Sequence, residues 1–369
     1  MEADFSLDRR RRETLADLRQ AMRRARLEHG TPYLDQLREI LVLGVGRHAL
    51  EPVEYFLYGL CDHRRHDRQD RRAFVGGGRP WGRGPLPLSA RITSKLGFER
   101  MMRGHGLPTT LTLARYGGEG PPAGVRLLAD EVALGRFLRE AADRRLFGKP
   151  LASSGGRCAL AVDGWEPAID RVRGIGGHCI PVPKLLRLLR PFAADGYLLQ
   201  ACLAPHPELA AVHPGRVSTV RALVRRTGSA AVLDRAAWRI PAAGNPADGF
   251  WTPGNLLGAV DPDTGRVWRV VDDFHPRQRV IRLHPASGLP LHNRTLPDWT
   301  MLRATVLAAA ELFPASPCLA FDAALTDDGP VLLGIEEGAG DPVLLQLAHD
   351  RGLGDDLPAA VAGRGSRAA

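Results

Sequence analysis

The sequence feature that most restricts the fold is a pair of apolar segments near the C-terminus, joined by the turn sequence Asp-Asp-Gly-Pro at 327–330. Such a turn between two apolar runs predicts an antiparallel hairpin. Asp322 and Glu336 lie within these runs, on strands that the hairpin would place side by side. A carboxylate in apolar surroundings is costly unless it is paired or binds a metal ion, and Mg²⁺ prefers such oxygen ligands. The alternative is two exposed carboxylates on the outer face of the hairpin, and the position of Asp322 between Phe321 and Ala323 favours the metal site.

The rest of the chain mixes helices with further hairpins. Helices are predicted over 5–62, 94–106, 130–144 and 298–313, and paired strands over 217–241 and 256–271. Ser94 and Asp130 have the residue types that cap helix N-termini. The pattern is not the strict strand–helix alternation of a doubly wound sheet, so we expect an α+β protein. Neither G-x-G-x-x-G nor G-x-x-x-x-G-K-S/T occurs, which argues against Rossmann and Walker nucleotide sites.

Composition indicates an ordinary globular protein of 369 residues, 44% hydrophobic and 25% charged. No run approaches the roughly 18 apolar residues of a membrane span, and the N-terminus has no apolar stretch typical of a secretory signal. The five cysteines are scattered without a C-x-x-C pair, as expected of reduced thiols. We therefore expect a cytoplasmic protein without a membrane span, a disulfide framework or a zinc site, and the sequence does not indicate its oligomeric state.

The net charge of +9 raises the alternative of a nucleic-acid-binding protein. However, the N-terminal arginines are mixed with Asp and Glu on a helical stretch, and no pattern of stacking aromatic residues accompanies them. A solvated helix face explains them better. We expect no nucleic-acid partner, and a small anionic substrate such as a nucleotide is the better use of the charge.

Three basic residues are candidates for phosphate contacts. Lys149 ends an apolar strand before the Ser/Gly loop 153–156, whose backbone N–H groups could cover phosphate oxygens. An ordinary hairpin turn is the alternative there, and Gly-rich turns are common. Arg221 alternates with apolar residues on a strand and could bind a phosphate or substrate carboxylate, or pair with a structural carboxylate. Lys95, at a helix start, is on its own best interpreted as a surface lysine.

Taken in order, these motifs resemble the ATP-grasp superfamily, and within it the sugar-transfer-associated branch, relatives of the α-L-glutamate ligases. The motifs are Ser94-Lys95-Leu-Gly-Phe, Gly106-Leu-Pro, Lys149-Pro150, Ser153 to Gly156, Leu198-Leu199-Gln200, Ser218-Thr219-Val220-Arg221, Val260-Asp261, His284-Pro285, Phe321-Asp322 and Ile335-Glu336. The resemblance covers roughly residues 50–345 and implies two α/β lobes with antiparallel sheets that clasp ATP. The expected divisions are an N-terminal helical region with its connection (1–90), a first lobe (91–200), a second lobe with the metal site (201–356) and a disordered tail (357–369).

The same resemblance implies roles for single residues. Arg221 would be the catalytic residue, steadying the transferring phosphoryl group or the acyl phosphate, and Asp322 and Glu336 would bind Mg²⁺. The residues implied in ATP binding are Lys95, Lys149, Ser153, Ser154, Gly155, Gly156, Gln200, Ala201 and Leu203. The implied activity is an ATP- and Mg²⁺-dependent carboxylate–amine ligase, which forms an amide through an acyl phosphate from small-molecule carboxylate and amine substrates.

The sequence departs from the branch at the second metal position. The branch has Glu-x-Asn there, and this chain has Glu336-Glu337-Gly338. An asparagine oxygen is therefore missing, and Glu337 would point to the opposite face of a continuing strand. This departure motivates the alternative function, a degenerate ATP-grasp protein that binds nucleotide without ligase activity and acts as a partner or scaffold.

Overall fold

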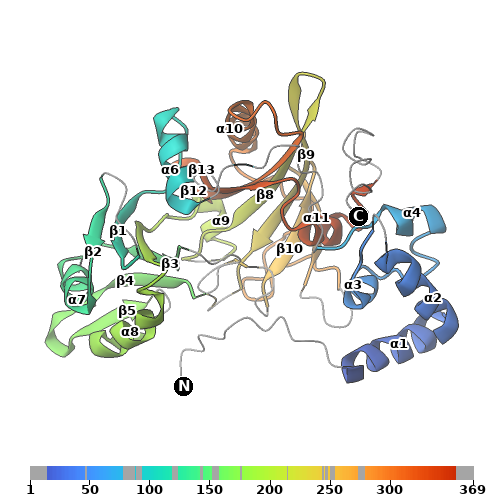
Figure 1. The fold of residues 1–369 in the computed structure, drawn as a ribbon, viewed down its shortest axis with the longest axis horizontal. Coiled ribbons are helices and arrows are strands. Elements are labelled where there is room, and N and C mark those ends of the chain that lie inside the picture. The colour runs from blue at the N-terminus through green and yellow to red at the C-terminus, as the bar shows by residue number, and fades with distance from the viewer. Residues whose placement is uncertain are drawn as a thin grey trace, which may run out of the picture.

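The computed structural model describes residues 15–45, 48–77, 88, 94–118, 124–141, 144–151, 158–174, 177–213, 215–242, 245, 248–249, 254–272 and 279–354. The described elements form two separate sheets and a group of N-terminal helices, which follow one another across the molecule (Figure 1). The second sheet lies between the first sheet and the N-terminal helices. None of the described helices is long and apolar enough to cross a membrane.

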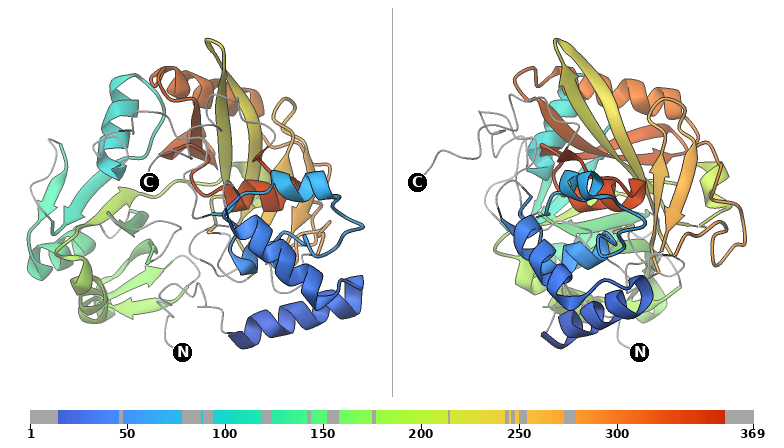
Figure 2. Two further views of the ribbon diagram at one scale, coloured as in Figure 1. Left: turned by 45° about the vertical axis from the view of Figure 1, so that its right-hand side comes forward. Right: turned by 90° about the vertical axis from the view of Figure 1, so that its right-hand side faces the viewer.

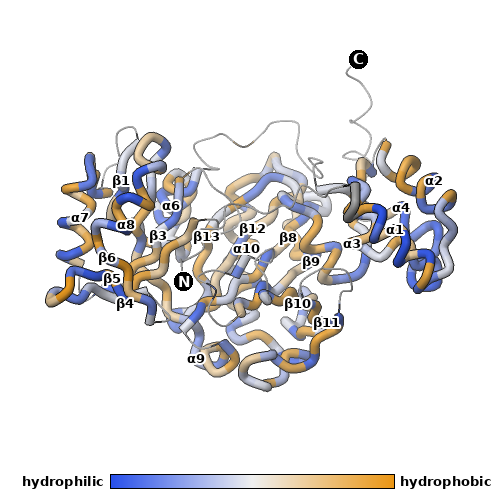
Figure 3. Tube along the Cα trace, turned by 90° about the horizontal axis from the view of Figure 1, so that it is seen from below, coloured by the Kyte–Doolittle hydropathy of each residue, from blue (hydrophilic) through white to orange (hydrophobic). Residues whose placement is uncertain are grey.

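The first sheet has the strand order β2-β1-β7-β3-β4-β5-β6 and is antiparallel except for the parallel pair β1–β2. Its strands are β1 (Thr112–Tyr116), β2 (Arg126–Leu128), β3 (Leu146–Pro150), β4 (Leu160–Glu166), β5 (Arg171–Gly174), β6 (Cys179–Pro181) and β7 (Tyr197–Ala201). The helices α7 (Glu131–Glu140) and α8 (Val182–Leu189) share a core with this sheet. Along α7, hydrophobic and hydrophilic residues alternate (Figure 3), and its buried side includes Leu134, Phe137 and Leu138.

The second sheet is antiparallel throughout and has the order β11-β10-β9-β8-β12-β13. Its strands are β8 (Thr219–Thr227), β9 (Ala230–Ile240), β10 (Leu256–Val260), β11 (Val267–Val271), β12 (Cys318–Thr326) and β13 (Gly329–Glu337). On one face, the core includes residues of α6 (Lys95–Gly104), α9 (Pro207–Ala210) and α10 (Trp299–Glu311). On the other face, it includes residues of α11 (Pro342–His349) and of the N-terminal helices.

The N-terminal helices are α1 (Leu15–His29), α2 (Tyr33–Gly44), α3 (Pro52–Leu57) and α4 (Arg68–Ala73), and they pack beside α11 (Figure 2). The buried Gln346 of α11 fixes this contact with both ends of its amide. Its nitrogen donates to the Tyr58 hydroxyl (2.9 Å) and the Val75 carbonyl (2.8 Å), and its oxygen accepts from the Val75 amide (2.9 Å). The N-terminal helices and the second sheet therefore share one core.

Several local predictions are confirmed. All three predicted hairpins form, as β8–β9, β10–β11 and β12–β13. Ser94 caps α6 by accepting from the Gly97 amide (3.1 Å), and Asp130 caps α7 by accepting from the Ala133 amide (2.7 Å). The helix predicted over 130–144 is shorter and ends at Glu140. The expected tail 357–369 lies outside the described residues.

Candidate nucleotide and metal site

Arg221 brings the two predicted metal-binding carboxylates together. Arg221 and Asp322 are register partners on β8 and β12, and Glu336 lies near the end of the adjacent strand β13. The Nη1 atom of Arg221 donates to both oxygens of Asp322 (3.1 and 3.2 Å) and to Oε1 of Glu336 (3.1 Å). Its Nη2 atom donates to Oε2 of Glu336 (2.7 Å). Both carboxylates therefore converge on one buried guanidinium, the side chain of which is 4% exposed.

A second arginine, which the sequence analysis did not select, completes this cluster. Arg239 of β9 donates from Nη2 to Asp322 Oδ1 (3.0 Å) and from Nε to the Thr219 hydroxyl (2.8 Å). The Thr219 hydroxyl donates in turn to Asp248 Oδ2 (2.5 Å). Arg239 carries the signal that selected Arg221, an arginine within an apolar strand, but nothing in its local sequence says which carboxylates it faces.

The charges at this cluster reinforce one another. Burial disfavours the ionised form of Asp322, but Arg221 and Arg239 outweigh burial and hold the pKa of its carboxyl below the ordinary value. Burial also opposes the charge on Arg221, and its two carboxylate partners outweigh that effect and raise its pKa. For Asp248, burial dominates over the attraction of Arg239 and raises the pKa. Asp322 is thus held ionised in a half-buried position.

Lys149 of β3 brings positive charge from the first sheet. It is half-buried, and burial together with the charge of Lys95 lowers its pKa to about 8, while Glu99 and Asp322 act in the opposite direction. Asp322 therefore acts electrostatically on Lys149 although the two residues belong to different sheets. The predicted lysine therefore lies within electrostatic range of Asp322, which belongs to the other sheet.

Lys95 differs from the interpretation as a surface lysine. It is the first residue of α6, is half-buried, and donates from Nζ to the carbonyl of Leu151 (2.7 Å). Burial lowers its pKa. Leu151 lies two residues before Ser153, and the predicted phosphate-covering residues Ser153 to Gly156 lie outside the described residues.

Gln200, predicted at the adenine slot, is buried and its side chain points into a polar network. Its amide nitrogen donates to Glu99 Oε2 (3.2 Å) and to the hydroxyls of Thr110 (3.1 Å) and Thr112 (2.9 Å). The neighbouring backbone amide of Ala201 donates to the Leu111 carbonyl (2.9 Å), and the carbonyl of Leu203 accepts from the Cys202 thiol (3.6 Å). Gln200 thus ties α6 to β7, and an adenine contact from this segment stays a prediction.

The donor set at Asp322 and Glu336 suits a hard cation. Their oxygens already converge on one cationic nitrogen, and the Glu336 side chain is 47% exposed, which leaves it accessible from solvent. No group of three or more His, Cys, Asp or Glu residues in the described part of the chain is arranged to hold a metal ion. Mg²⁺ is commonly bound by one or two carboxylates together with substrate phosphates, so these two residues fit Mg²⁺ that is shared with a nucleotide.

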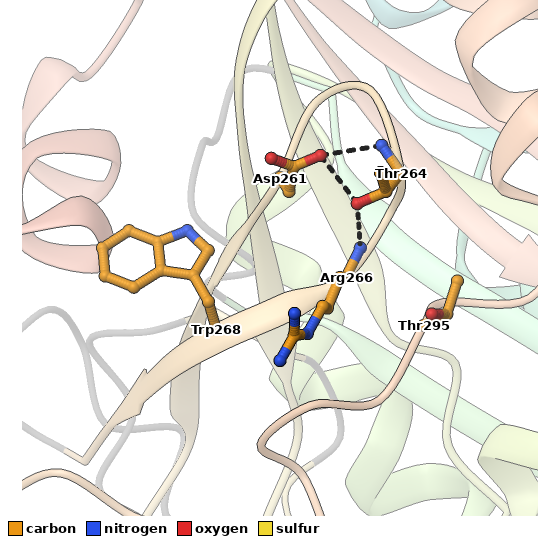
Figure 4. A pocket seen from close by; sticks show the side chains of 5 residues that line it. All are labelled: Asp261, Thr264, Arg266, Trp268 and Thr295. Carbon is orange, nitrogen blue, oxygen red and sulfur yellow. Dashed lines mark hydrogen bonds between the residues drawn. The ribbon is translucent and has the colours of Figure 1, made fainter.

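A separate shallow pocket of about 370 Å³ lies at the β10–β11 hairpin (Figure 4). It is lined by Asp261, Thr264, Arg266, Trp268 and Thr295. Asp261 Oδ1 accepts from the backbone amide (2.8 Å) and hydroxyl (2.7 Å) of Thr264, which fixes the turn. Strand β11 is the edge of the second sheet opposite to β13, so this pocket is distinct from the carboxylate–arginine cluster.

Comparison with known proteins agrees with this geometry. Residues 192–360, which include the whole second sheet, match the family described as sugar-transfer associated ATP-grasp. This segment is similar to sugar-transfer-associated ATP-grasp domains. The match contains Arg221, Arg239, Asp322 and Glu336. The structure itself confirms the predicted α+β architecture, with two sheets preceded by N-terminal helices. No curated protein matches the sequence.

Solved structures with distant similarity to this chain include several ligases. A D-alanine–D-alanine ligase from Coxiella burnetii is 11% identical, with 70% of this chain and 51% of that chain covered and a TM-score of 0.36. A D-alanine–D-alanine ligase from Bacillus anthracis is 9% identical, with 74% of this chain and 66% of that chain covered and a TM-score of 0.38. An N5-carboxyaminoimidazole synthase from Aspergillus clavatus is 11% identical, with 73% of this chain and 52% of that chain covered and a TM-score of 0.37. This chain thus spans about half to two thirds of the length of these proteins.

Proposed function

We propose that this protein is an ATP- and Mg²⁺-dependent carboxylate–amine ligase that forms an amide through an acyl phosphate. The observation that carries the proposal is the cluster in which Arg221 holds Asp322 and Glu336 together, within electrostatic range of Lys149 from the other lobe. The positive charge of Lys149 suits the phosphates of a nucleotide, and the negative charges of Asp322 and Glu336 suit the divalent cation that the phosphates carry.

The nucleotide would lie between the lobes. Lys149 and Lys95 would contact its phosphates as point charges, with the loop from Ser153 to Gly156 covering them. The segment from Gln200 to Leu203 would border the adenine. The position of Lys95, with its ammonium on the carbonyl that precedes the loop, supports its place beside the phosphates.

Asp322 and Glu336 would hold Mg²⁺ together with the phosphate oxygens. When bound, the ion neutralises charge on the phosphates and so favours transfer of the terminal phosphoryl group. Arg221 pairs with both carboxylates and Arg239 pairs with Asp322, and the two arginines offset part of the negative charge before an ion binds. We therefore expect Mg²⁺ to bind together with ATP rather than before it.

The proposed chemistry has two balanced steps. A substrate carboxylate attacks the γ-phosphorus of ATP, the bond to the β-phosphate oxygen breaks, and ADP leaves with that oxygen. An amine then attacks the acyl carbon, the amide bond forms, inorganic phosphate leaves with the electron pair, and the amine loses a proton. The described side chains would contribute charge and position, because Arg221 and the lysines would lie where phosphoryl charge is shared during transfer.

The test is ADP release by the purified protein with Mg²⁺, ATP and panels of carboxylates and amines. The proposal expects release that depends on both substrate classes and is abolished in Glu336→Gln with the fold retained. Full turnover by Glu336→Gln would refute the metal role of this carboxylate.

A second candidate function is nucleotide binding without ligation, favoured by Gly338 at the position of the family's asparagine. Under this alternative, ATP would bind with Mg²⁺ but no acid–amine pair would stimulate ADP release. Nucleotide binding measured beside the ADP screen separates the two functions.

The proposed reaction also indicates the kinds of partner and the location of the protein. The substrates would be small molecules, and we propose no nucleic-acid partner. All five cysteines are free of disulfide bonds, which supports a cytoplasmic location for the enzyme.

A further inference from the structure

A chain of buried polar contacts connects Asp322 with a loop beyond the sheet. Asp322 accepts from Arg239, Arg239 donates to the Thr219 hydroxyl, and that hydroxyl donates to Asp248. Thr219 and Arg239 are register partners on β8 and β9, and each is less than 10% exposed. Asp322, at one end of this chain of contacts, thus lies on a strand, and Asp248, at the other end, lies between β9 and β10.

The Thr219 hydroxyl is the central link because it is used in both directions. One oxygen accepts from the Arg239 Nε atom at 2.8 Å and donates its proton to Asp248. A direct contact between Arg239 Nε and Asp248 Oδ2 is much longer, 3.9 Å. Thr219 therefore supplies the hydrogen-bonded link between Asp248 and Arg239, beside their direct attraction, and loss of the hydroxyl would remove this link while leaving both charged groups in place.

Arg221 and Arg239 hold Asp322 from two directions. Arg221 contacts both oxygens of the carboxylate, so on its own it permits rotation about the axis that joins the two groups. Arg239 adds a contact to Oδ1 alone, from the neighbouring strand β9. A second donor from a different direction fixes the plane of the carboxylate, and a metal ligand displaced by even about 1 Å loses much of its effect.

We propose that Thr219 and Arg239 are positioning residues that orient the Asp322 carboxylate and couple it to the loop residue Asp248. This inference rests on the proposed function, since it assigns Asp322 to metal–nucleotide binding. It goes further, because it makes Asp248 a determinant of metal–nucleotide affinity although Asp248 is not itself a ligand.

The experiment compares Thr219→Val with Thr219→Ser. Valine keeps the size and β-branching of threonine but cannot accept or donate, whereas serine keeps the hydroxyl. The readouts are binding of Mn²⁺–ATP followed by electron paramagnetic resonance of Mn²⁺, and thermal unfolding of each variant. We expect Thr219→Val to weaken Mn²⁺–ATP binding about tenfold, with Thr219→Ser close to the unmodified protein, because loss of a hydrogen bond to a charged group is typically worth about a factor of ten or more.

Asp248→Ala provides the second variant, since Asp248 lies outside the strands. It should weaken Mn²⁺–ATP binding in the same direction with little change in unfolding temperature, which keeps the test decisive if Thr219→Val does not fold. If Asp248→Ala, or a folded Thr219→Val, binds Mn²⁺–ATP as tightly as the unmodified protein does, the inference is overturned and the proposed function stays intact. Failure of the unmodified protein to bind Mn²⁺–ATP would overturn both.

Discussion

Arg221 and Asp322 are register partners on β8 and β12, and one guanidinium nitrogen lies 3.1 and 3.2 Å from the two carboxylate oxygens. The same guanidinium reaches Glu336, so a single side chain joins three strands at the candidate site. Because this arginine is buried, its loss would leave Asp322 with a poorly compensated charge.

Arg221→Lys should therefore impair both stability and nucleotide-dependent activity. Lysine supplies one point charge and cannot contact two carboxylates with a planar fork. We expect a loss of about 1–3 kcal/mol in the free energy of unfolding and at least a tenfold loss in kcat/KM, measured by urea denaturation and ADP release. Arg190→Lys is the matched control, because Arg190 also contacts a carboxylate with two nitrogens but is exposed. Equal effects of the two substitutions would contradict this prediction.

Gly340 lies against the same ion pair. A β-carbon at this position would overlap Glu336 Oε2 and Arg221 Nη2, and the φ angle of +61° also disfavours other residues. Gly340→Ala should displace Glu336 and abolish Mg²⁺-dependent ATP binding. Gly288→Ala is the control, because Gly288 has a similar φ of +69° but no atom within 4 Å of an added β-carbon. ATP affinity is measured by calorimetry. The same ATP affinity for both variants would contradict the prediction that the added β-carbon acts by displacing Glu336.

Gly338 has a φ angle of +67°, a left-handed conformation that glycine and asparagine adopt most readily. The backbone is thus compatible with the family's asparagine, although this chain lacks the amide oxygen. Gly338→Asn should strengthen Mn²⁺–ATP binding several-fold by adding an oxygen ligand. Gly338→Ala adds the β-carbon without the oxygen and should not strengthen it. An asparagine variant that binds no better than the alanine variant would show that this position does not face the metal.

The lowered pKa of Lys149 predicts that ATP affinity depends on pH. Its pKa is lowered from 10.5 to about 8, so the ammonium is charged below pH 8 and becomes neutral as the pH rises above it. The charged form attracts phosphate, and ATP affinity should therefore fall between about pH 7 and pH 9.5. Lys149→Arg stays charged over this range and should flatten the profile. Parallel titrations of the two proteins with a fluorescent ATP analogue would show whether the profiles differ; identical profiles would exclude Lys149 as the cause.

The elements with strong local signals were predictable from sequence. The Asp-Asp-Gly-Pro turn and its apolar flanks predicted the β12–β13 hairpin, and Ser94 and Asp130 predicted the starts of α6 and α7. These features depend on turn chemistry and capping within a few residues, which a single sequence displays. The costly placement of Asp322 among apolar residues was also visible, and it selected the residue around which the cluster forms.

The partners of these residues were decided by the tertiary structure. Arg239 and Asp248 join Asp322 only because β8, β9 and β12 are neighbours in the sheet, and the order of strands is not written in any one strand. Lys95 is half-buried and Gln200 is buried because α6 contacts segments that are distant in sequence, at Leu151 and at Gln200 itself. The sequence by itself determined the hairpins, the helix starts and the basic and acidic residues available for the candidate site. Which charges meet, and how deeply they are buried, depended on long-range packing, because both are set by neighbours that lie far apart along the chain.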